Sequence, residues 1–294
     1  MDHPPKSPDG LLMFDLPAVA LHRRRAVARY GEHDFLAREV GTRLVERLDD
    51  TKRDFPLAAA FGWHGPVLES ALGNRGGVER LIRCGADPVS PGTGVLSEAE
   101  ALPFAAGSID LALSLLDWHW INDLPGLLVQ IRRALRPDGL LLGAMLGGDT
   151  LHELRGALLQ AEEEVEGGIS PRVSAFADVA DLGGLLQRAG FALPVVDVDT
   201  ITVTYADAFA LMRDLRGMGE ANAMAGRRRA FSRRETLLRA AALYSEQHGQ
   251  ADGRIPATFQ VLYMTAWCPH PEQPKPAKRG SARQSLASAL SDEA

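Results

Sequence analysis

Apolar residues follow one another almost without interruption in two short segments of the chain, residues 109–116 and 140–145. A strand that is buried on both faces has this pattern, because none of its side chains meets water. Further apolar or β-branched segments at 55–61, 78–84 and 195–204 predict three more strands. Together these segments are typical of a parallel sheet whose two faces are covered.

Apolar residues recur at helical spacing between these strands. Within residues 124–135 the leucines and one isoleucine form a single stripe, whereas Gln130 and the arginines lie off it, which predicts an amphipathic helix. Pro137 and Gly139 predict the end of that helix before the next strand. Strands that alternate with such helices predict an α/β fold. The same spacing predicts further helices at 23–48, 151–166, 180–189, 206–215 and 234–248.

The composition supports a folded protein with a substantial core. Of the 294 residues, 46% are hydrophobic and 24% are charged. The net charge of −6 argues against nucleic acid as the main partner. Two cysteines, Cys84 and Cys268, are too few for a disulfide framework or a multi-cysteine zinc site. No apolar run approaches the roughly 18 residues that a transmembrane helix needs, and we therefore expect a cytoplasmic protein without a transmembrane segment.

The polarity of the termini predicts the domain boundaries. Residues 1–12 and 269–294 are rich in proline and polar residues and are expected to be disordered. One domain is expected over residues 13–268. Its helices within about 206–250 are expected to form an insertion before a last strand at 258–267.

Four arginines, Arg23, Arg24, Arg25 and Arg29, lie close together in the first helical region. They form either a docking patch for an acidic partner or a solvated helix face. We favour the solvated face, because runs of charge on a helix usually have that origin.

Candidate functional residues follow the carboxyl ends of predicted strands, where α/β proteins bind their ligands. Gly62 and His64 follow the first strand, where His64 is either a catalytic group or the result of erosion of a cofactor-binding loop. His119 lies in an aromatic loop, 117–123, after the strand at 109–116, where it is a candidate general base or substrate contact. The alternative is a packed aromatic loop in which Asp123 caps the next helix. Asp149 follows the strand at 140–145 and either approaches a substrate or, like its neighbour Thr150, caps a helix.

The segment EAEALPFAAGSIDLALS resembles the motif that precedes and forms the fourth strand of class I S-adenosylmethionine (SAM) dependent methyltransferases. This resemblance implies a Rossmann-like sheet of seven strands, with helices on both faces and an antiparallel last strand. It also implies SAM as the cofactor. The cofactor-binding positions that it implies are Gly62, His64, Asp87, Glu98 and Asp117. Asp87 alternatively belongs to a turn before Pro88, and Glu98 is alternatively a solvated loop acid.

The loop after the first strand departs from the family's acidic residue and GxGxG motif. Gly62 holds the first glycine position, but His64 and Pro66 replace the second and third, and no acidic residue precedes them. Glycines there allow the close approach of backbone and cofactor that a Cβ forbids. The Cβ of His64 is expected to obstruct the cofactor or to open the loop, which predicts weak or absent SAM binding.

Several motifs in the second half of the chain resemble one branch of this superfamily, the complex I assembly factor 5 family of arginine hydroxylases and its bacterial homologues. They are LDWHWINDLPGLL, GAMLGGDTLHELR, GGISPRVSAFADVADLGGLLQRAGF, LMRDLRGMGEANA and DGRIPATFQVLYMTAW. The resemblance implies modification of a protein arginine during assembly of the respiratory NADH dehydrogenase, one subunit of which would be the partner.

The residues expected to act in this reaction are His119 and Asp149 as catalytic groups. Trp118, Trp120 and Glu220 are expected to contact substrate, on a surface formed by their loops that faces a protein partner. Alternatively, both tryptophans belong to the core. The alternative is a non-catalytic assembly factor or chaperone that keeps this surface and has lost SAM binding.

Overall fold

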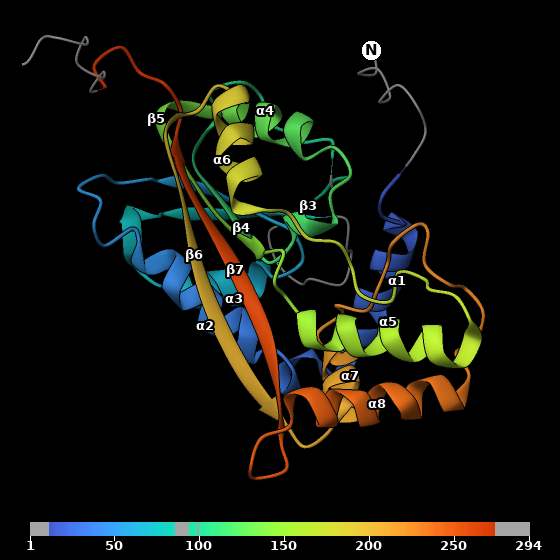
Figure 1. The fold of residues 1–294 in the computed structure, drawn as a ribbon. Coiled ribbons are helices and arrows are strands. Elements are labelled where there is room, and N and C mark those ends of the chain that lie inside the picture. The colour runs from blue at the N-terminus through green and yellow to red at the C-terminus, as the bar shows by residue number, and fades with distance from the viewer. Residues whose placement is uncertain (1–11, 86–93, 99, 274–294) are drawn as a thin grey trace, which may run out of the picture.

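The computed structural model describes residues 12–85, 94–98 and 100–273. Seven strands of these residues form one sheet in the order β3-β2-β1-β4-β5-β7-β6 (Figure 1). The first five strands pair in parallel, whereas β7 is antiparallel to both of its neighbours. The predicted α/β fold with an antiparallel last strand is confirmed. The strands are β1 (Leu57–Phe61), β2 (Arg80–Gly85), β3 (Gly94–Leu96), β4 (Ile109–Leu115), β5 (Leu135–Leu146), β6 (Ala192–Tyr205) and β7 (Ile255–Trp267).

Helices cover both faces of the sheet and form two separate cores. On one face, α2, α5, α7 and α8 pack on the side chains of β1, β4, β5 and β7. On the other face, α4 and α6 pack on the alternate residues of the same strands. Figure 1 shows α5, α7 and α8 together near the lower end of the long β6–β7 pair. The helices are α1 (Leu16–Ala26), η1 (Val27–Glu32), α2 (Phe35–Glu46), α3 (Gly65–Leu72), η2 (Arg75–Gly77), η3 (Trp118–Trp120), α4 (Leu124–Ala134), α5 (His152–Glu166), α6 (Val179–Arg188), α7 (Ala208–Gly217) and α8 (Arg234–His248).

Strand β4 lies at the centre of the sheet, between β1 and β5. Every residue from Ile109 to Leu115 is buried except Asp110, which is half-buried. The Asp110 carboxylate accepts the N–H of Leu57 at 3.0 Å and a guanidinium N–H of Arg136 at 2.8 Å. Asp110 therefore joins the amino ends of neighbouring strands, and its role is structural.

The structure differs from the sequence-based expectations at several element ends. The helix α3 and the strand β3 were not predicted, because eight and three residues are too short for a clear periodic pattern. Asp149 and Thr150 do not cap α5, which follows Leu151 in a left-handed conformation (φ 55°). Their side chains bond instead to the side chain and carbonyl of Gln260 on β7. Asp123 caps α4 as predicted, accepting the N–H of Gly126.

Within residues 12–85, 94–98 and 100–273, no helix is long and apolar enough to cross a bilayer.

Candidate functional site

A cavity of about 480 Å³ opens at the carboxyl ends of β1, β2 and β4. This volume lies in the range of about 300–1,000 Å³ that small-molecule sites occupy. Residues of α1 form one wall, and the opposite wall comes from the loops that end the strands. Those loops supply Gly62, Trp63, Glu98 and Asp117. The cavity therefore lies where a doubly wound sheet is expected to bind its ligand.

Gly62 is required by the geometry of the loop after β1. Its φ is +99°, a conformation that residues with a side chain rarely adopt. A Cβ built on Gly62 would lie 2.5 Å from the carboxyl carbon of Asp117. The N–H of Gly62 donates to the carbonyl of Cys84 at 2.9 Å, which holds the loop against the end of β2. A side chain here would displace Asp117 from the cavity wall.

Arg23 and Asp117 form an ion pair in the wall of this cavity. The guanidinium Nη2 lies 2.7 Å from Asp117 Oδ1, and the two side chains are only 13% and 7% exposed. The guanidinium carbon also lies 5.7 Å from the centre of the Trp63 ring, a cation–π distance. Among the described residues, Arg23 Nε has no hydrogen-bond partner. The pair therefore presents one positive and one negative group to the cavity.

Arg23 was not predicted from the sequence as a site residue. Arg24, Arg25 and Arg29 are exposed, as the solvated-face interpretation expects, but Arg23 turns inward. A buried arginine in a run of arginines carries no distinguishing sequence signal. It becomes recognisable only when Asp117 and Trp63 are placed beside it.

His64 points away from the large cavity. Its Nδ1 lies 2.6 Å from the hydroxyl of Tyr30, and its ring helps to line a second, small cavity of about 30 Å³ together with Glu220. Pro66, which follows, lies in the first turn of α3, where proline is well tolerated. The steric reason for expecting weak SAM binding therefore does not apply to the His64 side chain. The affinity for SAM itself stays a prediction.

Burial lowers the pKa of His64 to about 4, and the neighbouring Arg23 also disfavours a positive ring. The unfolded chain takes up a proton near the ordinary value of 6.5, while the folded chain keeps His64 neutral. The contribution of neutral His64 to the free energy of unfolding is therefore fully present above pH 6.5, and it is lost as the pH falls towards 4.

We expect the variant His64→Gln to lose less stability than the parent between pH 6.5 and 4. Glutamine can keep a hydrogen bond to Tyr30 but does not titrate. Denaturant unfolding at several pH values measures the effect, with His152→Gln at an exposed position as the matched control. Equal pH dependence of the parent and His64→Gln would contradict the prediction.

His119, Trp120 and Glu220 form a compact buried group beside the cavities. Glu220 Oε2 lies 2.9 Å from His119 Nε2 and accepts the indole N–H of Trp120 at 3.0 Å. The side chain of His119 is fully buried and packs against Phe176, with ring centres 5.7 Å apart. Burial acts to raise the pKa of Glu220, but the charge and hydrogen bond of His119 outweigh it and hold that pKa below its ordinary value. Glu220 is therefore a carboxylate at neutral pH.

The prediction that Trp118 and Trp120 anchor a protein partner on an exposed surface is wrong. They are only 1% and 2% exposed. Trp118 packs so closely on β5 that a Cβ at Gly143 would lie 2.9 Å from its ring, and Trp120 packs edge-on against Phe14. Alternating apolar and polar residues do not distinguish a buried aromatic loop from an exposed one. Both rings nevertheless line the large cavity.

Comparison with known proteins gives the family. A family model described as a methyltransferase domain matches residues 82–143. The solved structure of a Bacillus halodurans protein assigned as a methyltransferase superposes with a TM-score of 0.51 at 13% identity, covering 77% of this chain and 99% of that chain. The mitochondrial arginine-hydroxylase NDUFAF5 of Danio rerio is 46% identical over 87% of this chain and 82% of its own length. The chain belongs to the NDUFAF5 family.

Further relatives agree with this membership. Human NDUFAF5 is 45% identical over 86% of this chain and 75% of its own length. A malonyl-[acyl-carrier protein] O-methyltransferase of Laribacter hongkongensis is 36% identical, over 83% of this chain and 86% of its own length. Both resemblances drawn from the sequence motifs, to class I methyltransferases and to the NDUFAF5 family, are thereby confirmed.

The structure of this NDUFAF5 family member brings only part of the predicted site together. Gly62, Glu98 and Asp117 line the large cavity, and Glu98 is exposed at its edge. Asp149 is exposed, bonds to Gln260 and lines neither cavity. Asp87 lies outside the described residues.

Proposed function

We propose that this member of the NDUFAF5 family binds SAM in the large cavity and modifies an arginine side chain of a protein partner during assembly of the respiratory NADH dehydrogenase. The methyltransferase-domain match supports the cofactor, and the name arginine-hydroxylase, carried by relatives 45–46% identical to this chain, supports the substrate. A cytoplasmic location remains a prediction from the sequence, whereas the named relatives are mitochondrial.

The observation that carries this proposal is the Arg23–Asp117 pair beside Gly62. The amino-acid end of SAM is a zwitterion, with one carboxylate and one ammonium group. A site for it needs one cation and one anion next to a backbone that allows close approach. Arg23, whose Nε has no hydrogen-bond partner in the described part of the chain, would hold the carboxylate, and Asp117 would hold the ammonium group. When bound, SAM supplies a reactive sulfonium centre, while these residues bind and orient it.

The substrate side of the proposal rests on Glu220. Its Oε1 has no hydrogen-bond partner among the described residues, and the carboxylate is ionised at neutral pH. A guanidinium group suits such a carboxylate chemically, because planar cations pair with carboxylates and stack on aromatic faces. The small cavity beside Glu220, of about 30 Å³, would have to widen to admit it. His119, bonded to Glu220, is the proposed proton-handling group. His119 lines neither cavity itself and would act through Glu220, which lines the small one. Asp149 is left out of the proposed site, because it lines neither cavity and bonds to Gln260, which lines neither cavity either.

Calorimetric titration of the full chain with SAM and with S-adenosylhomocysteine tests the cofactor site. We expect dissociation constants in the low micromolar range, because the His64 side chain lines the small cavity and not the large one. This expectation replaces the weak or absent SAM binding that the loop motif predicts. Asp117→Asn should weaken SAM binding by roughly 10- to 100-fold, which corresponds to about 1.4–2.8 kcal/mol. Asp181→Asn, at an exposed position on α6, is the matched control.

Absence of SAM binding by the folded parent would reject this proposal in favour of the non-catalytic assembly factor. Substrate modification is a separate test. Mass spectrometry of respiratory NADH dehydrogenase subunits from cells with and without the chain should show a mass change at one arginine. If no such mass change is found, the proposed arginine substrate is rejected, but the proposed cofactor is not.

A further inference from the structure

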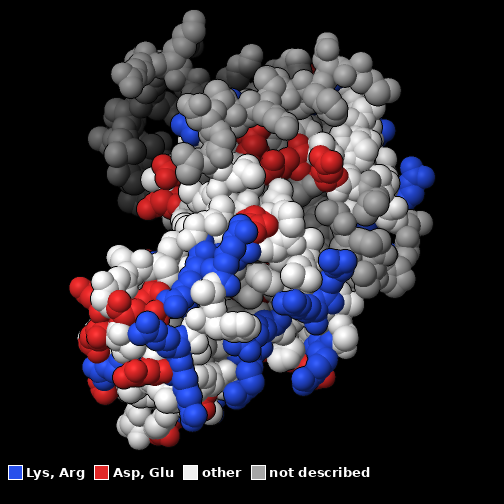
Figure 2. Space-filling view, turned by 90° about the vertical axis from the view of Figure 1, so that its right-hand side faces the viewer, with Lys and Arg blue, Asp and Glu red and all other residues white. Residues whose placement is uncertain are grey.

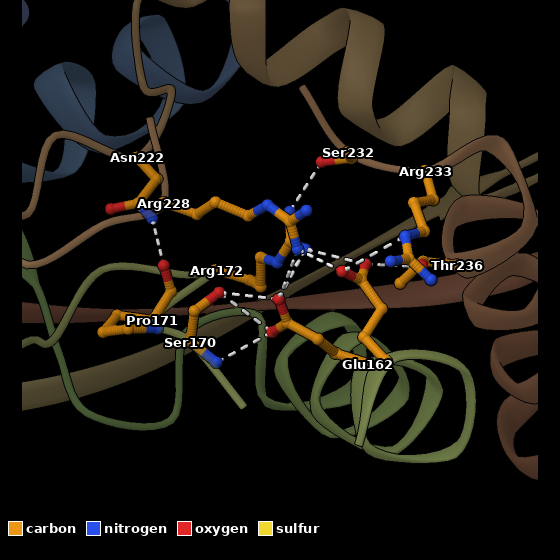
Figure 3. A network of polar contacts seen from close by, with 10 residues as sticks. Glu162, Ser170, Pro171, Arg172, Asn222, Arg228, Ser232, Arg233 and Thr236 are labelled. Carbon is orange, nitrogen blue, oxygen red and sulfur yellow. Dashed lines mark hydrogen bonds and ion pairs between the residues drawn. The ribbon is translucent and has the colours of Figure 1, made fainter. Parts of the chain in front are cut away.

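The carboxylates of Glu162 and Glu166, at the C-terminal end of α5, hold together the loop that follows α5 and the loop that precedes α8. Figure 3 shows this network. Arg172 Nη2 lies 2.6 Å from Glu162 Oε1, and Arg228 pairs with both Glu162 and Glu166. The carboxylate side chains are only 4% and 10% exposed. Burial acts to raise the pKa of Glu162, but the bonds from Arg172 and Ser170 outweigh it and hold that pKa at about 2. The network is therefore fully charged at neutral pH.

This network fixes the loop 226–233, which precedes α8, on both sides of Phe231. On the N-terminal side of Phe231, Arg228 forms ion pairs with Glu162 and Glu166 of α5. After it, the Ser232 hydroxyl accepts a bond from Arg172 at 2.6 Å, and Thr236 donates to Glu166 at 2.7 Å. The loop thus presents its centre in a defined position, so little conformational freedom remains to be lost on binding.

Phe231 projects fully into solvent from this fixed loop. It is 100% exposed, whereas Ile169, on the adjoining loop, is 68% exposed. A fully exposed phenylalanine gains nothing for folding, because none of its apolar surface is removed from water. An aromatic side chain presented in this way is typical of an anchor for an interface.

The surroundings of Phe231 are positively charged. Arg229 and Arg233 are 74% and 64% exposed, and their nearest carboxylates, Asp15 and Glu166, are 3.6 and 3.8 Å away. Five arginines in this region (Arg172, Arg227, Arg228, Arg229 and Arg233) share three carboxylates (Asp15, Glu162 and Glu166), which leaves an excess of two positive charges. Figure 2, which views this side of the molecule, shows Lys and Arg side chains from the middle to the bottom of this face, with Asp and Glu side chains gathered at its lower left.

We propose that the loop 226–233 is a docking surface for an acidic segment of a protein partner, which receives Phe231 between its own apolar side chains. An apolar anchor with a charged rim is the arrangement of a protein interface, and the excess positive charge selects an acidic partner. The excess is small on a chain whose net charge is −6, which disfavours a polyanion such as nucleic acid.

The surface also adjoins the large cavity. Arg227 bonds to Asp15 at 2.9 Å, and Asp15 caps α1, which forms one wall of that cavity. A partner that docks on the loop is therefore placed beside the wall that carries Arg23. This surface does not depend on whether the cavity binds SAM.

Fluorescence anisotropy of the full chain with a labelled synthetic peptide rich in glutamate and leucine tests the proposal. We expect salt-sensitive binding that Phe231→Ala weakens about tenfold, equivalent to about 1.4 kcal/mol. The double variant Arg229→Gln with Arg233→Gln should weaken it by at least as much. Val129→Ala, an exposed apolar residue on α4, and Arg213→Gln with Arg216→Gln on α7 are the matched controls. Because the substituted side chains are exposed, thermal unfolding should be unchanged.

Three comparisons decide the result. A peptide of the same length rich in lysine and leucine should not bind. Vesicles of anionic phospholipid and a single-stranded oligonucleotide should bind less tightly than the acidic peptide. The proposal is overturned if Phe231→Ala binds the acidic peptide as tightly as the parent does, if no binding is seen, or if vesicles or the oligonucleotide bind more tightly.

Discussion

Replacing Glu220 by leucine is expected to lower the free energy of unfolding by roughly 3–5 kcal/mol, because two buried groups lose their acceptor at a cost of about 1–3 kcal/mol each. The change leaves His119 and the indole N–H of Trp120 buried without their common acceptor. In a chain of this size the melting temperature should fall by roughly 6–20 °C. Denaturant unfolding gives the free energy directly.

Two control variants separate the loss of the buried hydrogen-bond acceptor from the loss of a carboxylate as such. Glu220→Gln keeps an acceptor for Trp120 and should recover part of the stability. Glu98→Leu removes a carboxylate that is exposed at the edge of the large cavity and should change stability little. Equal stability of Glu220→Leu and Glu98→Leu would show that the buried group contributes nothing.

Gly62→Ala is expected to destabilise the chain and to abolish tight SAM binding. A side chain at a φ of +99° strains the backbone by about 1–3 kcal/mol. The clash of its Cβ with Asp117, at 2.5 Å in the parent, adds about 1–3 kcal/mol. Because Asp117 must move, its ion pair with Arg23 breaks, and SAM affinity should fall at least tenfold. Thermal unfolding and calorimetric titration measure the two effects.

Gly73→Ala isolates the backbone contribution. Gly73 also has a positive φ, of +53°, but no atom of the described residues lies within 4 Å of a Cβ built there. This variant should show the strain without the clash, and SAM binding should be unchanged. If Gly62→Ala is no less stable than Gly73→Ala, the close contact with Asp117 does not limit this position.

The sequence predicted most of the sheet because buried strands have a strong local pattern. Strand β4 is apolar except for Asp110 and Ser114, the second half of β5 is continuously apolar, and the stripe on α4 is regular. The short elements α3 and β3 lack such a pattern, and they were missed. The start of β5 at Leu135 was placed five residues late, because Pro137 and Gly139 were interpreted as a turn, although the strand continues through them.

The site was predicted only in part, because contacts between distant segments leave no local signal. Gly62 and Glu98 were found through the family motif, and both line the large cavity. The motif could not show that His64 turns towards Tyr30, which lies thirty-four positions earlier in the chain. Nor could it show that the loop of Trp118 and Trp120 is buried by α1 and β5.

The sequence by itself determined the fold and the family of this protein. Periodic burial is a local property, and the motifs of the NDUFAF5 family are contiguous in the chain. The tertiary structure alone decided which polar groups meet. The pairing of Arg23 with Asp117, and of Glu220 with His119, joins residues about a hundred positions apart. Charge is stabilised inside a protein only by the partner that packing brings to it, so these assignments required the folded chain.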